Sequence, residues 1–250
     1  MLQEIFSAGT SPIHRLDPRS RIVMAVLYAF VVALSNQFSA LLAACAFSFV
    51  LAGISRLSIP DLSKRVAVVN GFVFFFWLVV PVTYPGEALF SLGPLTVSRE
   101  GVLVAFRITL KSNAILLAFI ALVATSPVAT LGAALGRLGV PGKIVYLLLL
   151  NYRYLFVVEE EYHRLVRSAT VRGFQPSTTL HTYRTFAYLV GMLFVRASER
   201  AERVYMAMLC RGFSGKFHSL QTFSFSGRDW IWLFSMTVML VVIGGLEWVN

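Results

Sequence analysis

The 250-residue chain is 57% hydrophobic, and only 14% of its residues are charged. A soluble domain is about 45–50% apolar and about 25% charged, so the composition favours a membrane protein over a soluble one. The two cysteines, Cys45 and Cys210, exclude a disulfide framework and a cysteine-based zinc site. The formal net charge of +10 could serve nucleic acid, anionic lipid or an acidic protein partner, and the placement of the cations has to separate these possibilities.

The N-terminal half predicts four membrane spans after a polar arm. Residues 1–21 contain the turn signals Ser11-Pro12 and Asp17-Pro18. Apolar runs follow that have or approach the length needed to cross the bilayer, at 22–34, 38–54, 66–84 and 102–124. Between the second and third runs we expect a small charged loop, which contains Arg56, Asp61, Lys64 and Arg65.

Three features modify this picture of four spans. Pro81 is expected to kink or end the third span. Residues 85–101 predict a loop that includes a short hairpin or a half-buried turn. Arg107 and Lys111 lie four residues apart inside the fourth run, where snorkelling to the outer interface and a place in a polar bundle interior both fit.

The C-terminal half predicts a different architecture. A Gly- and Pro-rich connector begins near residue 125, and two long amphipathic helix patterns follow at 144–172 and 179–211. The apolar run at 230–246 is a fifth span, with Trp230, Trp232 and Trp248 placed as in an aromatic belt. The predicted fold is all-α: a polytopic membrane helical bundle of about five spans with a cytoplasmic domain of long amphipathic helices. Its predicted divisions are 1–21 (cytoplasmic arm), 22–124 (four spans), 125–229 (connector and cytoplasmic helices) and 230–250 (last span).

The cations gather on one side of the predicted bilayer. Segments 1–21, 55–66 and 125–229 carry 19 of the 22 Lys and Arg residues, and the exceptions are Arg99, Arg107 and Lys111. The positive-inside rule therefore predicts a multi-pass protein of the plasma (inner) membrane with the N-terminus and the 125–229 region in the cytoplasm. This distribution accounts for the basic charge through the lipid bilayer and a protein partner, without nucleic acid.

An internal repeat lies in the two amphipathic helices. Both copies fit the pattern E-x3-R-x7-R-G-F, with Glu160, Arg164, Arg172, Gly173 and Phe174 in the first and Glu199, Arg203, Arg211, Gly212 and Phe213 in the second. The four-residue step makes each Glu and the next Arg a favourable helix pair. Glycine after the last arginine is the usual left-handed helix stop, so each helix should end on an arginine at the pole of the helix dipole that favours a cation.

The ordinary interpretation of one basic helix end is contact with lipid headgroups. Two matched ends favour another interpretation, because a guanidinium can make bidentate, charge-assisted contacts with a carboxylate. The repeat thus indicates docking to two acidic grooves, as a dimeric partner would offer.

The sequence resembles the CbiQ/EcfT transmembrane components of energy-coupling-factor transporters, a class of ABC importers, over nearly its whole length. The resemblance rests on the arm Ser11-Pro-Ile-His-Arg-Leu-Asp-Pro-Arg19, on the order of spans, and on two signatures, Ala169-Thr-Val-Arg172-Gly173 and Ala207-Met-Leu-Cys-Arg211-Gly212. The second signature has one extra residue between Ala and Arg. The length and the arm are most similar to the cobalt branch, CbiQ, while nickel and vitamin systems share the scaffold.

This resemblance implies a coupling domain that docks on two ATP-binding cassette ATPase subunits. Nucleotide-driven closure of those subunits would be transmitted to a small substrate-binding membrane subunit, with cobalt ion uptake as the expected result. The implied ATPase-coupling residues are Ala169, Arg172, Gly173, Ala207, Arg211 and Gly212, with Glu160, Arg164, Glu199 and Arg203 supporting the coupling helices.

The sequence gives little indication of nucleotide binding, metal binding or acid–base catalysis by this chain. No G-x-x-x-x-G-K-[ST] sequence occurs, so we expect a non-catalytic subunit without a cofactor, with ATP and Mg in the partner ATPases. No metal site is expected, because no two histidines share a coordinating spacing (His14, His163, His181 and His218). The carboxylate run Glu159-Glu160-Glu161 shares its helix with Arg164 and Arg167, which favours ion pairing or a solvated face over acid–base catalysis.

Two alternatives come from other functional classes. A self-sufficient secondary transporter or channel should have ionisable groups at mid-membrane and paired broken helices, and uptake by the purified chain alone would support it. An enzyme acting on lipid-linked substrates would use the basic helices to bind phosphates and needs a carboxylate or histidine cluster near the interface. Product formation from a phospholipid would support that alternative.

Overall fold

The computed structural model describes residues 13, 16–55, 58–92, 95–215 and 225–248. The chain forms two compact units. The described residues of 4–134 and 222–250 form the first, called here the bundle unit, and those of 135–221 form the second, called the hairpin unit. Each unit is described by itself.

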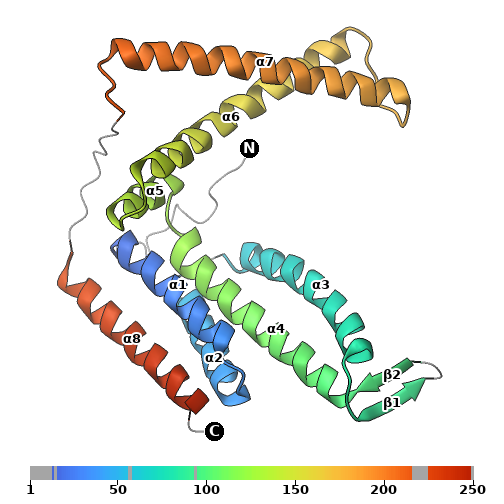
Figure 1. Ribbon diagram of the computed structural model, residues 1–250, viewed down its shortest axis with the longest axis vertical. Helices are drawn as coiled ribbons and strands as arrows, with labels where there is room; N and C mark the ends of the chain where they lie inside the picture. Colours follow the sequence, from blue (N-terminus) through green and yellow to red (C-terminus); the bar gives the residue numbers. More distant parts are fainter. Residues whose placement is uncertain (1–12, 14–15, 56–57, 93–94, 216–224, 249–250) are drawn as a thin grey trace. The chain divides into compact units, whose positions relative to one another are not determined.

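The bundle unit is built from helices and one small hairpin of strands (Figure 1). Helices α1, α2, α4 and α8 pack together, and α3 packs along α4. In chain order the elements are α1 (Pro18–Leu34), α2 (Phe38–Ile54), α3 (Ile59–Thr83), β1 (Ala88–Leu92), β2 (Leu95–Ser98), α4 (Arg99–Phe119), the π-helix η2 (Ile120–Ala124) and α8 (Gly227–Trp248).

Small residues at the helix contacts explain the close packing of the bundle. Ala40, Ala44 and Ala114 are fully buried, and such side chains let helix backbones approach closely in a membrane. Buried hydroxyls add interhelical bonds: the Tyr28 hydroxyl lies 2.7 Å from the Ala44 carbonyl oxygen, and Ser48 donates to the Ala114 carbonyl oxygen at 2.8 Å. The core of the unit therefore joins α1, α2 and α4 through both apolar and polar contacts.

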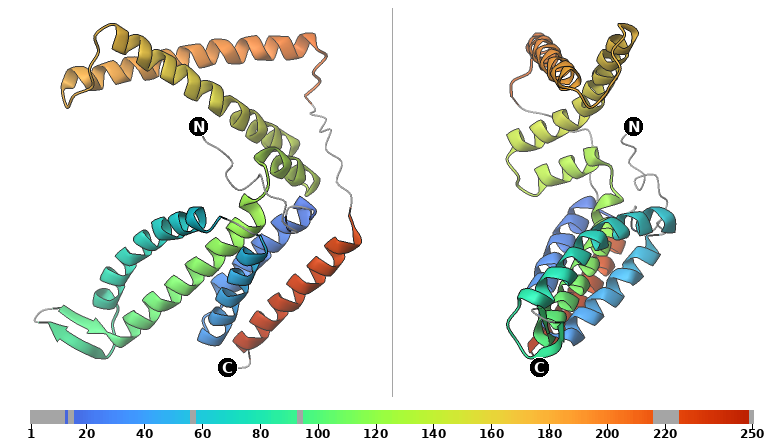
Figure 2. Two further views of the ribbon diagram at one scale, coloured as in Figure 1. Left: turned by 180° about the vertical axis from the view of Figure 1, so that it is seen from behind. Right: turned by 90° about the vertical axis from the view of Figure 1, so that its right-hand side faces the viewer.

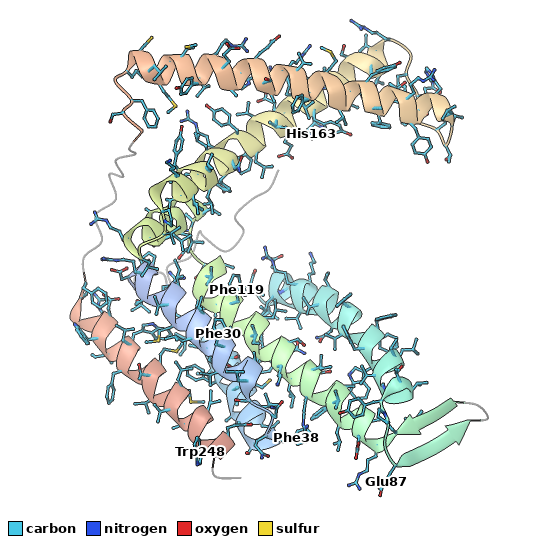
Figure 3. The ribbon with its side chains drawn as sticks, viewed as in Figure 1. Phe30, Phe38, Glu87, Phe119, His163 and Trp248 are labelled. Atoms are coloured by element: carbon cyan, nitrogen blue, oxygen red, sulfur yellow. The ribbon has the colours of Figure 1, made fainter. Side chains whose placement is uncertain are left out.

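The bundle unit has the outer surface expected of a membrane protein. Phe30 of α1 and Phe119 of α4 stand on its outside (Figure 3) and are 65% and 52% exposed. Among the described residues, three helical stretches are long and apolar enough to cross a membrane: Ile59–Thr83, Arg99–Ala124 and Gly227–Trp248. These features confirm the predicted all-α membrane class. Helices α1 and α2 have 17 residues each, or ~25 Å of rise, so the count of five spans stays a prediction.

Helix α3 corrects the predicted charged loop. It begins at Ile59, so Asp61, Lys64 and Arg65 lie within the helix. Pro60 occupies a first-turn position, where its missing N–H costs nothing, and Asp61 sits in the same turn, where the helix dipole favours a carboxylate. These are start signals of a helix that the charge pattern concealed. At the other end, α3 stops at Thr83, two residues after Pro81, as predicted.

Residues 88–92 and 95–98 form a short hairpin, one of the two alternatives expected in this region. Strands β1 and β2 pair antiparallel, with a register shift between Ala88 and Phe90. Helix α4 follows directly, and the Ser98 hydroxyl caps it by accepting from the Gly101 N–H at 3.1 Å. Gly101 is required here, because a Cβ at this position would lie 2.7 Å from the Pro81 Cα.

The predicted connector after residue 125 contains a helix that the sequence analysis missed. Helix α5 spans Val128–Arg137 despite its two glycines, and Leu131 donates its N–H to the Pro127 carbonyl oxygen at 3.0 Å. Its end has the expected glycine signal: Gly139 has a φ of +93°, and the Val140 N–H donates back to the Leu135 carbonyl oxygen.

The hairpin unit contains the two long helices, α6 (Gly142–Val171) and α7 (Leu180–Cys210). Both lie within two residues of the predicted patterns at 144–172 and 179–211. The two helices cross each other in the left view of Figure 2. Few of their residues are buried, so a large part of their apolar surface is available for contacts beyond this chain.

Candidate functional site

The C-terminus of α6 is a Schellman motif that presents Arg172. Arg172 is the capping residue, and Gly173 follows with a φ of +88°. The Gly173 N–H donates to the Thr170 carbonyl oxygen at 3.0 Å, and the Phe174 N–H donates to the Ala169 carbonyl oxygen at 3.1 Å. These two bonds define the motif, and its left-handed position is one that glycine occupies without a steric penalty.

The C-terminus of α7 repeats this motif residue for residue. Arg211 is the capping residue, and Gly212 has a φ of +77°. The Gly212 N–H donates to the Leu209 carbonyl oxygen at 2.9 Å, and the Phe213 N–H donates to the Met208 carbonyl oxygen at 3.0 Å. The E-x3-R-x7-R-G-F repeat of the sequence is therefore a repeat of backbone geometry.

The motif also shows how the two alanine-containing signatures align. The residue whose carbonyl accepts from the phenylalanine N–H is Ala169 in α6 and Met208 in α7. Both residues are half-buried, whereas Ala207 lies one position earlier and is exposed. Met208 thus occupies the position equivalent to Ala169, and the sequence analysis missed it because the Ala-x-x-Arg-Gly pattern drew attention to Ala207. The constant spacing of the repeat could have identified Met208.

The phenylalanine that ends each repeat packs against the other helix. The ring of Phe174 meets Phe186 of α7 edge-on, with centroids 5.7 Å apart. The ring of Phe213 lies 5.8 Å from Tyr146 of α6, centroid to centroid. An apolar contact commonly accompanies a Schellman motif. Here it fixes both helix ends within the hairpin unit.

The arginines at the two ends differ from the arginines that precede them. Arg164 pairs with Glu160 at 2.5 Å, and Arg203 lies 3.8 Å from Glu199, so both predicted helix pairs form. These are exposed surface pairs, worth about 0.3–0.5 kcal/mol each. Arg172 and Arg211 are exposed, and no ion pair within the described part of the chain involves either one. Their guanidinium groups are available to a partner.

A separate ionic contact holds the crossing of α6 and α7. Glu161 of α6 pairs with Arg196 of α7, and Arg200 and Arg164 approach the same carboxylate at 3.8 Å and 3.9 Å. The Glu161 side chain is only 12% exposed. The hydrogen bond from Arg196 lowers the pKa of this carboxyl, and the charges of the surrounding arginines act in the same direction against the effect of desolvation. The predicted ion pairing of the Glu159–Glu161 run is confirmed at Glu160 and Glu161.

Two grooves border the α6–α7 pair. One has a volume of about 380 Å³, and its lining is mainly apolar apart from Asn151 and the ionic contact of Glu161, Arg196 and Arg200. Its walls include Tyr146, Leu150, Tyr154, Leu193, Val204 and Met208. The other has a volume of about 530 Å³ and contains Arg172 itself, with Ala169, Phe174, His181, Tyr188 and Met192. Each helix end therefore adjoins a concave surface.

The described residues offer no metal centre, since no three His, Cys, Asp or Glu side chains gather among them. His163 and His181 are exposed on α6 and α7, and Figure 3 labels His163 in the second half of α6. His14 and His218 lie outside the described residues.

Arg107 and Lys111 contact the turn between α1 and α2. The Lys111 ammonium donates to the Ala33 carbonyl oxygen at 2.8 Å and to the Asn36 side-chain oxygen at 3.1 Å. The Arg107 guanidinium lies 4.8 Å from the centroid of the Phe38 ring, a cation–π contact. Glu247 of α8 accepts from the Asn36 N–H at 3.0 Å, so the end of α1, the start of α2 and the end of α8 meet at this turn. These contacts account for Lys111 without a ligand, whereas the buried Nε of Arg107 has no hydrogen-bond partner among the described residues.

Most of the chain, with both helix ends, matches one known protein family. The family model described as CbiQ, cobalt transport protein, matches residues 9–222, which include both helix ends. The chain belongs to the CbiQ family.

Relatives of this CbiQ-family chain match it over nearly its whole length. A protein of Brevibacillus brevis named energy-coupling factor transporter transmembrane protein EcfT is 28% identical, with 98% of each chain covered. Proteins with the same name from Bacillus subtilis and Acidaminococcus fermentans are each 25% identical, with 95% and 96% of this chain and 93% and 94% of the relatives covered. The CbiQ scaffold of this chain is thus that of a membrane component of transporters.

Proposed function

We propose that this protein is the transmembrane coupling subunit of an ABC importer of the energy-coupling-factor type. Arg172 and Arg211 dock on two ATP-binding cassette ATPase subunits, and the α6–α7 pair passes their nucleotide-driven motion to a small substrate-binding membrane subunit. The observation that carries this proposal is the pair of identical Schellman ends, each presenting an exposed arginine without an ion-pair partner among the described residues.

The geometry of the two helix ends supports their docking into a partner's groove that carries a carboxylate. A guanidinium offers two parallel N–H donors, which match a carboxylate bidentately. The side chain of Arg172 leaves the helix at its last turn, where the glycine redirects the chain, so a partner can reach it without steric hindrance from a further turn. Lipid headgroups would accept the same charge, but they do not require two identical backbone motifs.

The separation of the two ends supports two docking sites instead of one. Phe174 contacts Phe186 near the start of α7, while Arg211 caps the end of α7. About 25 residues of helix, or ~37 Å at 1.5 Å per residue, lie between Phe186 and that end. One small domain would hardly span such a distance. Two ATPase subunits, each with one acidic groove, fit it well.

The chain itself supplies no phosphate-binding loop, so ATP and Mg belong to the partner ATPases, and this subunit is non-catalytic. The cation distribution supports a plasma (inner) membrane orientation with the N-terminus and the α6–α7 pair in the cytoplasm. The family description supports cobalt ion as the substrate of the assembled importer. The relatives named EcfT leave the same coupling role open for nickel or a vitamin, because selectivity would reside in the substrate-binding subunit.

The test is co-purification of the ATPases with variants of this chain. The variants are Arg172→Ala, Arg211→Ala and the double variant, with Arg153→Ala as a control because Arg153 is also exposed on α6 but lies in the helix interior and not at a Schellman end. Each single variant should lower the yield of bound ATPase, and the double variant should abolish it, while membrane insertion and the Arg153→Ala control remain at wild-type levels. Full ATPase binding and uptake by the double variant would exclude the proposal.

A further inference from the structure

A buried arginine lies at the start of α1, outside the docking ends. Arg21 is only 2% exposed. Its Nε donates to the Leu122 carbonyl oxygen at 2.9 Å, and its Nη2 donates to the Thr125 hydroxyl. Thr125 is itself 1% exposed and donates to the Ala121 carbonyl oxygen at 3.0 Å. Burial of a charged group is costly unless its donors are satisfied, so this contact has to be specific.

The sequence explains why the Leu122 carbonyl needs a donor. In a regular helix it would accept from residue 126, but the N–H groups of Thr125 and Ser126 both donate to the Val123 carbonyl oxygen. In a π-helix it would accept from residue 127, which is a proline and has no N–H. The carbonyl is therefore left over at the end of η2, and Arg21 satisfies it.

A second buried charge ties α1 to α8. Asp229 is 2% exposed, and its carboxylate accepts from the Asp17 N–H at 2.9 Å and from the Ser226 N–H at 2.8 Å. Asp17 is also buried and caps α1 by accepting from the Arg19 N–H at 2.9 Å. One carboxylate thus organises the first turns of both helices.

These contacts coincide with the places where the chain passes between its two units. After Thr125 and Ser126 the chain enters α5, which leads into the hairpin unit. The described part of the chain resumes in the bundle unit at residue 225, next to Ser226 and Asp229. Arg21 binds Leu122 and Thr125, just before α5 begins. Asp229 binds Ser226, just before α8 begins, and Asp17 at the start of α1. Both sites are therefore hydrogen-bonded to the start of α1. We name Asp17, Arg21, Thr125 and Asp229 the polar anchor.

We infer that the polar anchor transmits movement of the hairpin unit to the bundle unit, and that Arg21 is a positioning residue for this coupling. The inference rests on the proposed function. A connector that can rotate freely absorbs displacement, whereas one that is hydrogen-bonded to a packed helix passes it on, because packed helices shift as rigid elements. With the anchor intact, displacement of α6 and α7 reaches α1 through the α5 connection, which Arg21 holds at Leu122 and Thr125.

The variants that test this inference keep the shape of the anchor. Thr125→Val replaces the hydroxyl by a methyl group of similar size, and Arg21→Lys keeps the charge but loses the planar fork that reaches two acceptors. Tyr28→Phe is the matched control, because Tyr28 is a 1% exposed residue of α1 whose buried hydrogen bonds lie away from both chain connections. If Arg21→Lys fails to insert into membranes, Thr125→Val decides the test.

The measurement is hydrogen exchange of the complete importer complex with and without a non-hydrolysable ATP analogue. In the wild type and in Tyr28→Phe, nucleotide should change exchange both in α6–α7 and in α1–α2. In Thr125→Val and Arg21→Lys, the change in α6–α7 should remain, while the change in α1–α2 falls about tenfold, as expected from the loss of one charge-assisted hydrogen bond.

The outcomes separate the inference from the function on which it rests. ATPases that do not bind the wild-type chain, or nucleotide that leaves α6–α7 unchanged, would refute the proposed function. A response in α6–α7 of the wild type that never reaches α1–α2 would overturn the anchor alone. Wild-type transmission in Thr125→Val, or an equal loss in Tyr28→Phe, would overturn it as well.

Discussion

The left-handed glycines at the two helix ends give the sharpest prediction. Gly173 and Gly212 have φ values of +88° and +77°, and a Cβ added at either position would meet no atom within 4 Å. Alanine there would therefore be penalised by backbone conformation alone, at ~1–2 kcal/mol. A penalty of this size lowers the equilibrium constant for forming the Schellman motif roughly 5–30-fold. Arg172 or Arg211 would then lose its fixed direction.

The expected result is a loss of ATPase affinity without a loss of the helix. Gly173→Ala and Gly212→Ala should each raise the dissociation constant of the ATPases for the corresponding end, by at most roughly 5–30-fold, since only the population with the native turn binds. Asparagine tolerates the left-handed region better than alanine, so Gly173→Asn should give a smaller effect. The assay is titration of purified ATPase onto the chain in lipid nanodiscs.

The matched control is Gly191→Ala in the interior of α7. Gly191 is exposed, and a Cβ added there also meets no atom within 4 Å, but its backbone is helical. Alanine should stabilise this helix by about 0.5–1 kcal/mol and leave ATPase affinity unchanged. The reasoning fails if Gly173→Ala binds like the wild type, or if Gly191→Ala weakens binding to the same extent.

Three further predictions concern the contacts around the site. The pKa of Glu161 is lowered in the folded state, so its ion pair with Arg196 stabilises the α6–α7 crossing fully above the carboxyl's unfolded pKa of about 4.3, and this stabilisation is lost as pH falls through the lower folded pKa. Spin labels on the two helices of the wild type should report a wider distance distribution only in that acid range, whereas Glu161→Gln should show the wider distribution already at neutral pH. Met208→Ala should lower the melting temperature of the chain in detergent, because it removes a half-buried side chain against Tyr146, whereas Ala207→Ser should leave it unchanged. Lys111→Ala should destabilise the chain by about 1 kcal/mol in the same melt through the loss of its bond to the α1–α2 turn, with ATPase binding unaffected.

Helix ends were predictable wherever local signals agreed with the apolar pattern. The limits of α6 and α7 follow from the glycine stops at Gly173 and Gly212, which act within one turn of the chain. The same logic failed for α5, because Gly132 and Gly136 suggested a connector although packing tolerates them inside a helix. It failed for the start of α3, where charged side chains concealed a Pro60–Asp61 helix start.

The site was predictable to the extent that it is local. The repeat pointed to Arg172 and Arg211 and to the turns that present them, since these depend on residues close in sequence. The Glu161–Arg196 pair depends on where two helices cross, and the Arg21–Leu122 bond joins residues about a hundred positions apart, so neither has a signature along the chain. Even so, the proline at 127, which deprives the Leu122 carbonyl of its donor, was visible in the sequence.

The structural difference between the two helix ends bears on how a partner would recognise them. The ends share the backbone turn, the exposed arginine and the phenylalanine that packs on the opposite helix. They differ in the last helical side chains, among them the residue beneath the turn, which is Ala169 in one and Met208 in the other. A partner that recognised the side chain beneath the turn would require the same residue at both ends. A partner that recognised a guanidinium held in a fixed direction would require only the turn and its aromatic anchor. The turn and its aromatic anchor are the features present at both ends. Substitution of the glycines should therefore weaken docking almost as effectively as substitution of the arginines.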